Sequence, residues 1–168
     1  AILHDTVEDG SLVFAAKICG IKNPSEGESR LLMLSFMKEE FGERAARFVK
    51  AVSNDVKVPG DAALSPEEKA IIYKTHLSNE VIGKPEVLAI KLADYLDNAG
   101  SLPHNDIPGA EARVKKQAFK YLPCVSLFQE EVNKSTSVLP SQALPKIQEQ
   151  LERIKVNLTH ITTKYANL

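Results

Sequence analysis

The apolar residues near the carboxyl end of the chain repeat with the period of an α-helix. They alternate in steps of three and four: Leu144, Ile147, Leu151, Ile154, Leu158, Ile161, Tyr165 and Leu168. Such steps place side chains along one face of a helix in a heptad pattern. Elsewhere the apolar residues also recur three or four apart, and no segment shows the sustained alternation of a β-strand. The pattern predicts an all-α protein with a C-terminal amphipathic helix over about residues 141–168.

These eight residues, the heptad seam, have two interpretations. The seam packs on the body of its own domain, or it pairs with the same helix of a second chain and forms a homodimer. A repeat of about three heptads does not decide between a core-facing stripe and a coiled coil.

Length and charge limit the kind of protein. A chain of 168 residues is the size of one domain, and a net charge of −1 gives no bulk attraction to nucleic acid or anionic membrane. The longest apolar run, Leu12 to Ile21, is interrupted by Lys17 and is shorter than the about 20 residues that span a bilayer. Two cysteines far apart in sequence suit a reducing compartment. We expect one domain over residues 1–168, with a core over about 1–132, a linker over about 133–140, and a cytoplasmic location.

Glycine, proline and capping residues predict where the helices end. A first helix runs through Asp9 and ends at Gly10, and residues 11–36 contain a turn and a segment for which helix is favoured over strand. The further expected elements are a helix over 37–52, a break at Val58–Gly60, a helix from the Ser65 capping box to about Asn79, a helix from Pro85 to Gly100, and a helix over about 110–132.

The first helix carries a dense acidic cluster. His4 and Glu8, and likewise Asp5 and Asp9, are four residues apart and share a helix face. A helix that ends at Gly10 places these carboxylates at its C-terminal end, where the helix dipole opposes negative charge and the carboxylates repel one another. A divalent cation would offset that repulsion. The alternative is that the acidic residues simply cap a solvated helix end.

A second polar cluster lies in the helix after Pro85. Asp94 and Asn98 share a face, while Leu92 and Leu96 point toward the core, so Asp94 is expected to be partly buried. A partly buried carboxylate needs a partner. Metal ligation is one such partner, and a hydrogen bond to Lys91 is the other.

Together the two clusters resemble the HD-domain metal-dependent phosphohydrolases, in particular the RelA/SpoT-like hydrolases of guanosine tetraphosphate and pentaphosphate. The segment Ala1–Asp9, with its His-Asp-x-x-Glu-Asp pattern, looks like the His-Asp and Glu-Asp segment of the family. The segment Val87–Asp94 looks like the second metal-ligand helix, and residues 39–43 with the helix after them are similar to the connecting helix. The resemblance covers about residues 1–130 and implies a single HD-type helical domain.

The resemblance implies a role for each matching position. It gives His4, Asp5 and Asp94 as ligands of a divalent metal, typically Mn²⁺, and Glu8 and Asp9 as the groups that orient and activate the attacking water. Nucleotide contacts are implied for Asn98 and Ser101, and we expect Lys91 beside them. The implied reaction releases the 3′-diphosphate as pyrophosphate.

The chain departs from the family pattern in ways that keep alternatives open. The family has a further metal-ligand histidine about two dozen residues before the His-Asp pair, and this sequence begins three residues before His4. Tyr95 stands where the family usually has a basic residue, and Asn98 is followed by Ala99 and Gly100 instead of an arginine. The alternatives are an HD phosphohydrolase of another nucleotide, and a catalytically inactive helical module that binds a nucleotide or a protein.

Overall fold

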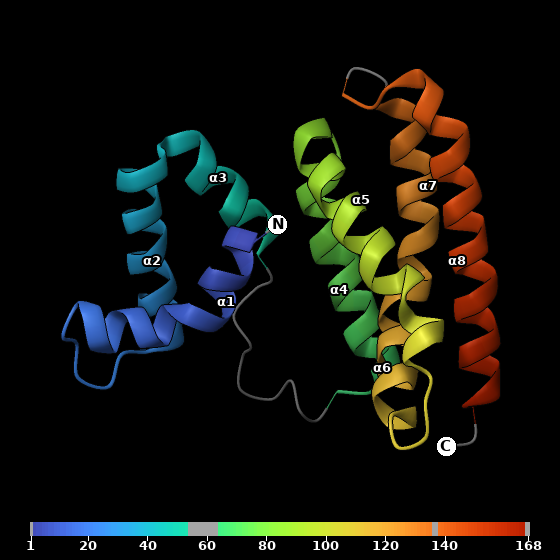
Figure 1. The fold of residues 1–168 in the computed structure, drawn as a ribbon, viewed down its shortest axis with the longest axis horizontal. Helices are drawn as coiled ribbons and strands as arrows, with labels where there is room; N and C mark the ends of the chain where they lie inside the picture. Colours follow the sequence, from blue (N-terminus) through green and yellow to red (C-terminus); the bar gives the residue numbers. More distant parts are fainter. Residues whose placement is uncertain (1, 54–63, 136–137, 167–168) are drawn as a thin grey trace. The chain divides into compact units, whose positions relative to one another are not determined.

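A computed structural model describes residues 2–53, 64–135 and 138–166. The predicted break at Val58–Gly60 and the seam residue Leu168 lie outside them. The chain divides into two compact units, Ala1–Pro59 and Gly60–Leu168. Every regular element in the described ranges is helical, which confirms the all-α class (Figure 1). One HD-type domain over residues 1–168 stays a prediction.

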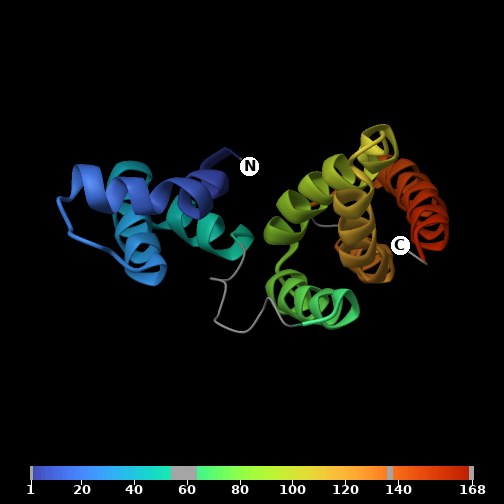
Figure 2. The same cartoon turned by 90° about the horizontal axis from the view of Figure 1, so that it is seen from below.

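The first unit consists of α1 (Ile2–Val13), the π-helix η1 (Phe14–Ile18), α2 (Glu26–Phe41) and α3 (Glu43–Val52). Helix α1 packs against both α2 and α3 (Figure 2). Their contact buries a small apolar core: Val7, Met33, Met37 and Val49. A capping box between Ser25 and Glu28 begins α2, so the segment within residues 11–36 for which helix is favoured over strand is helical from Glu26 onward.

Two glycines act differently from the prediction. Gly10 does not end the first helix: α1 continues to Val13 and passes directly into η1, whose Ala15 is fully buried. Gly42 divides the predicted helix 37–52 in two, because its φ of 84° lies in the left-handed region that interrupts a right-handed helix. Phe41, the last residue of α2, is 56% exposed.

The second unit contains α4 (Pro66–Val81), α5 (Pro85–Gly100), η3 (Leu102–Asn105), α6 (Glu111–Tyr121), η4 (Leu122–Cys124), α7 (Val125–Lys134), η5 (Ser141–Ala143) and α8 (Leu144–Lys164). The capping box of Ser65 and Glu68 begins α4 as predicted, and α5 has the predicted bounds. The predicted helix 110–132 is interrupted at η4, where Pro123 has no N–H to donate and its ring blocks regular α-helical packing.

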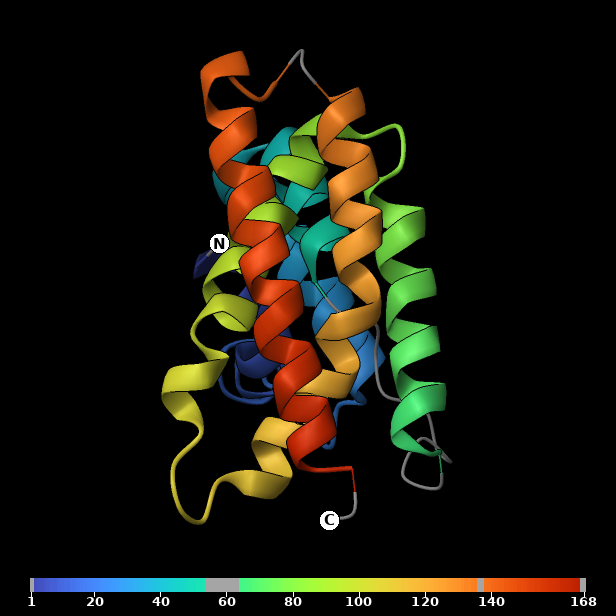
Figure 3. The same ribbon diagram turned by 90° about the vertical axis from the view of Figure 1, so that its right-hand side faces the viewer.

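Helix α8 belongs to the core of the second unit. It packs along α5, α6 and α7 (Figure 3). The seam residues Leu151, Ile154, Leu158 and Ile161 are at most 2% exposed, within one apolar cluster with residues of α4 to α7. The first interpretation of the seam is therefore the one that the structure shows. A homodimer through the seam has no support in this packing.

Candidate functional site

The acidic cluster lies along the middle of α1. Asp5 and Asp9 are exposed and Glu8 is half-buried, on either side of the buried Val7; the side chain of His4 lies outside the described residues. Because α1 continues to Val13, Asp9 is four residues from the end of the helix. The dipole acts within the last turn. The prediction that these carboxylates oppose the dipole at the helix end is wrong. The position of the carboxylates therefore no longer favours a bound cation over exposure to solvent.

The polar residues of α5 form a connected group. Asp94 is half-buried, as predicted, and the partner it has is Asn98, whose Nδ2 donates to Asp94 Oδ1 over 3.0 Å. Ser101, the C-cap of α5, donates from Oγ to the backbone oxygen of Asn98 over 3.2 Å. Lys91 is only 5% exposed, so it does not share the exposed surface of α5 on which Asn98 lies.

Tyr95 explains one departure from the family pattern. Its side chain is 2% exposed, and its hydroxyl donates to the backbone oxygen of Tyr121 over 3.0 Å. Its ring packs edge-on to Tyr121 and lies 4.6 Å from the ring centroid of Phe128. Burial raises the pKa of the Tyr95 hydroxyl. A basic residue at this position would bury a charge. In this chain the residue after Asp94 therefore packs in the core and does not contact a substrate.

Tyr121 lies within electrostatic range of the Asp94 carboxylate. Burial, and then the negative charge of Asp94, raise the pKa of Tyr121 to about 12. A positive charge also lies beside this tyrosine: Lys120 Nζ is 5.3 Å from the centroid of the Tyr121 ring and 4.1 Å from that of Tyr73. The surroundings of Asp94 therefore include the buried Tyr121 of α6, and Lys120 lies over the rings of Tyr121 and Tyr73.

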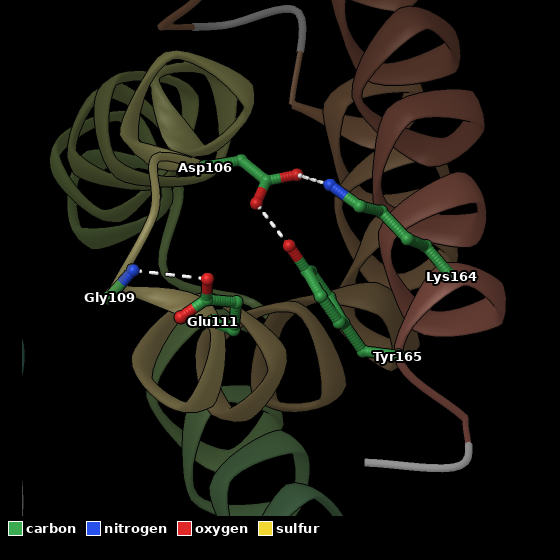
Figure 4. Close-up of polar contacts among 5 residues, drawn as sticks. All are labelled: Asp106, Gly109, Glu111, Lys164 and Tyr165. Carbon is green, nitrogen blue, oxygen red and sulfur yellow. Dashed lines mark hydrogen bonds and ion pairs between the residues drawn. The ribbon is translucent and has the colours of Figure 1, made fainter.

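The loop after α5 carries a second polar group, which sequence reasoning missed. Asp106 accepts hydrogen bonds from Lys164 Nζ (2.8 Å, at Oδ2) and from the Tyr165 hydroxyl (at Oδ1) (Figure 4). The backbone N–H of Gly109 donates to Glu111 over 3.0 Å at the start of α6. The partners of Asp106 are 58 and 59 residues away in the sequence, so no local sequence pattern predicts these contacts.

These contacts predict how the stability contributed by Asp106 depends on pH. The hydrogen bonds from Lys164 and Tyr165 lower the pKa of Asp106, and the hydrogen bond to Asp106 raises the pKa of Lys164. The stabilisation should be complete between about pH 5 and 9, and be lost as the pH falls through the folded-state pKa of Asp106 or rises through that of Lys164. Urea unfolding of the wild type and Asp106→Asn across pH measures it. A stability difference that stays constant down to about pH 2 would contradict the assignment.

The two halves of the predicted metal site lie in different units. Helix α1 belongs to the first unit and α5 to the second. Among the described residues no group of three or more His, Cys, Asp and Glu side chains is arranged to hold a metal ion. The donor types of the predicted set, one imidazole and two carboxylates, suit Mn²⁺. Asp94 accepts from Asn98 at Oδ1, and its second carboxylate oxygen is of the type that binds a divalent cation.

Comparison with known proteins assigns the chain to no family. Within the described part of the chain, no helix combines the length and apolar character needed to cross a membrane. No family model, no curated protein and no solved structure matches the chain.

Proposed function

We propose that the chain is a metal-dependent pyrophosphohydrolase of the HD type that acts on guanosine tetraphosphate or pentaphosphate. The observation that carries the proposal is the pairing of two specific motifs, His-Asp-x-x-Glu-Asp at residues 4–9 and Lys-Leu-Ala-Asp-x-x-x-Asn at residues 91–98. The helical setting of both motifs supports it. A nucleotide of this kind is intracellular, so the proposal includes a cytoplasmic location.

In this proposal His4, Asp5 and Asp94 would hold Mn²⁺. When bound, the ion would polarise a phosphoryl oxygen and lower the pKa of its water ligand. Glu8 and Asp9 carry the carboxylates that would accept the proton of the attacking water. The water oxygen bonds to the phosphorus attached to the ribose 3′ oxygen, that ester bond breaks, and the 3′ oxygen takes a proton. The products are pyrophosphate and the 5′-phosphorylated guanosine.

The substrate contacts in the proposal are Asn98 and Ser101. Asn98 is exposed, and its amide is oriented by Asp94 through the hydrogen bond to Oδ1. Ser101 carries a hydroxyl next to it, at the end of the same helix. Hydroxyl and amide groups donate to phosphate oxygens and accept from ribose hydroxyls. Lys91 does not enter the proposal, because its side chain is buried.

The test is hydrolysis of a nucleotide panel by the whole chain with and without added Mn²⁺. The panel contains guanosine tetraphosphate and pentaphosphate, GTP, GDP and ATP, and the products are resolved by anion-exchange chromatography. We expect manganese-dependent release of pyrophosphate from the two 3′-diphosphates. Cleavage of another nucleotide alone would support the related phosphohydrolase. Nucleotide binding by calorimetry with no turnover and no bound metal would contradict the proposal and support the inactive binding module.

A further inference from the structure

The turn that follows α5 is built on one of the proposed substrate contacts. The backbone oxygen of Ser101 accepts from the N–H of His104 (3.0 Å) and from Asn105 Nδ2 (3.3 Å), while Ser101 Oγ donates to the oxygen of Asn98. The N–H of Asp106 donates to Pro103 at the end of the same turn (3.4 Å). Overlapping short-range hydrogen bonds therefore span residues 98–106.

The distal end of this turn is held by the last residues of α8. Both carboxylate oxygens of Asp106 are engaged, one by Lys164 and the other by Tyr165 (Figure 4). Tyr165 is 7% exposed and its ring belongs to the core cluster. The packing of the ring therefore restricts where its hydroxyl can lie. Hydrogen bonds to a charged group are stronger than neutral ones, and a buried ring loses little further freedom in making one.

We propose that Tyr165 and Lys164 are positioning residues that, through Asp106, hold the turn 101–106 so that Ser101, next to the Asn98 amide that Asp94 orients, presents its hydroxyl in one arrangement to the phosphates of a nucleotide. This inference rests on the proposed function. The short-range hydrogen bonds of the turn are largely exposed, and water competes with them. The contact with α8 holds the turn against the packed core. A nucleotide that binds an already ordered turn loses less free energy to ordering it.

The experiment compares Tyr165→Phe and Lys164→Met with a matched change at the other end of α8. Tyr165→Phe keeps the buried ring and removes only the hydroxyl. The control is Gln148→Ala, because Gln148 also joins α8 to a neighbouring element, donating to Gln129 (3.0 Å) and Asn133 (3.1 Å) of α7. We expect KM for the hydrolysed nucleotide to rise about tenfold in Tyr165→Phe and Lys164→Met, with kcat within about twofold of the wild type. Gln148→Ala should leave KM unchanged, and Lys164→Arg, which keeps the charge, should restore most of the affinity.

Amide hydrogen exchange provides a readout that does not need turnover. The N–H groups of His104 and Asp106 should exchange faster in Tyr165→Phe than in the wild type, and those in the middle of α8 should not. Unchanged exchange at these amides overturns the proposal whether or not the chain is an enzyme. An active wild type with unaltered KM in both variants overturns the inference alone, whereas an inactive wild type overturns the proposed function.

Discussion

The Asp94→Ala variant is expected to lose manganese-dependent pyrophosphate release by at least about 100-fold. Changes to groups that only support a metal ligand already cost about 10- to 100-fold, so loss of a ligand should cost more. The measurement is the initial rate of pyrophosphate release from guanosine tetraphosphate at saturating Mn²⁺. The side chain that the variant removes is the half-buried carboxylate that accepts a hydrogen bond from Asn98.

Two further variants separate the charge of Asp94 from its hydrogen bond. Asp94→Asn keeps an oxygen that can accept from Asn98 but removes the charge, and it should be as inactive as the alanine variant. Asp97→Ala makes the same change of charge on the exposed part of the same helix, and it should retain wild-type turnover. Wild-type turnover in Asp94→Ala would exclude the metal-ligand role, and equal losses in Asp94→Ala and Asp97→Ala would point to a general effect of charge.

Truncating Leu158 should cause a large loss of stability. Leu158→Ala is expected to lower the free energy of unfolding of the second unit by about 2–5 kcal/mol, because the side chain is fully buried and its removal leaves a cavity. The matched control is Val156→Ala on the same helix, where the side chain is 61% exposed and the change should stay within about 0.5 kcal/mol. Urea unfolding followed by circular dichroism measures both.

The Leu158 comparison also tests the homodimer interpretation of the heptad seam. If the seam joined two chains, the midpoint of unfolding would rise with protein concentration, and Leu158→Ala would shift the sedimentation coefficient toward that of a monomer. If the seam packs inside the second unit, the midpoint is independent of concentration and the variant loses stability without a change of mass. Equal stability of Leu158→Ala and Val156→Ala would contradict the packing of α8.

Helix starts that depend on neighbouring residues were predictable. The Ser65 capping box forms because Ser65 Oγ accepts from the N–H of Glu68 (3.1 Å) and Glu68 accepts from the N–H of Ser65 (2.8 Å). Both partners lie within one turn, so the sequence contains the whole interaction. The same signal is present at Ser25 and Glu28, and it would have located the start of α2.

In the first unit, glycine alone did not predict where the helices end. A glycine fits a helix interior at a cost of about 1 kcal/mol relative to alanine, and it also fits the left-handed conformation that ends a helix. Gly10 lies in the interior of α1, whereas Gly42 adopts the left-handed conformation between α2 and α3. The core decides between them: η1 continues α1 and buries Ala15, whereas the bend at Gly42 allows Met37 and Val49 to enter the same apolar cluster.

The sequence by itself determined the all-α class, the face that Asp94 shares with Asn98, and the apolar face of α8. These features depend on helix periodicity and on contacts within about four residues, which the order of the amino acids contains directly. Only the tertiary structure decided that the heptad seam is buried in its own unit, that Tyr95 belongs to the core, and that Asp106 is held by the end of α8. Those outcomes depend on which helices pack together, and packing joins residues nearly 60 positions apart that no local pattern relates.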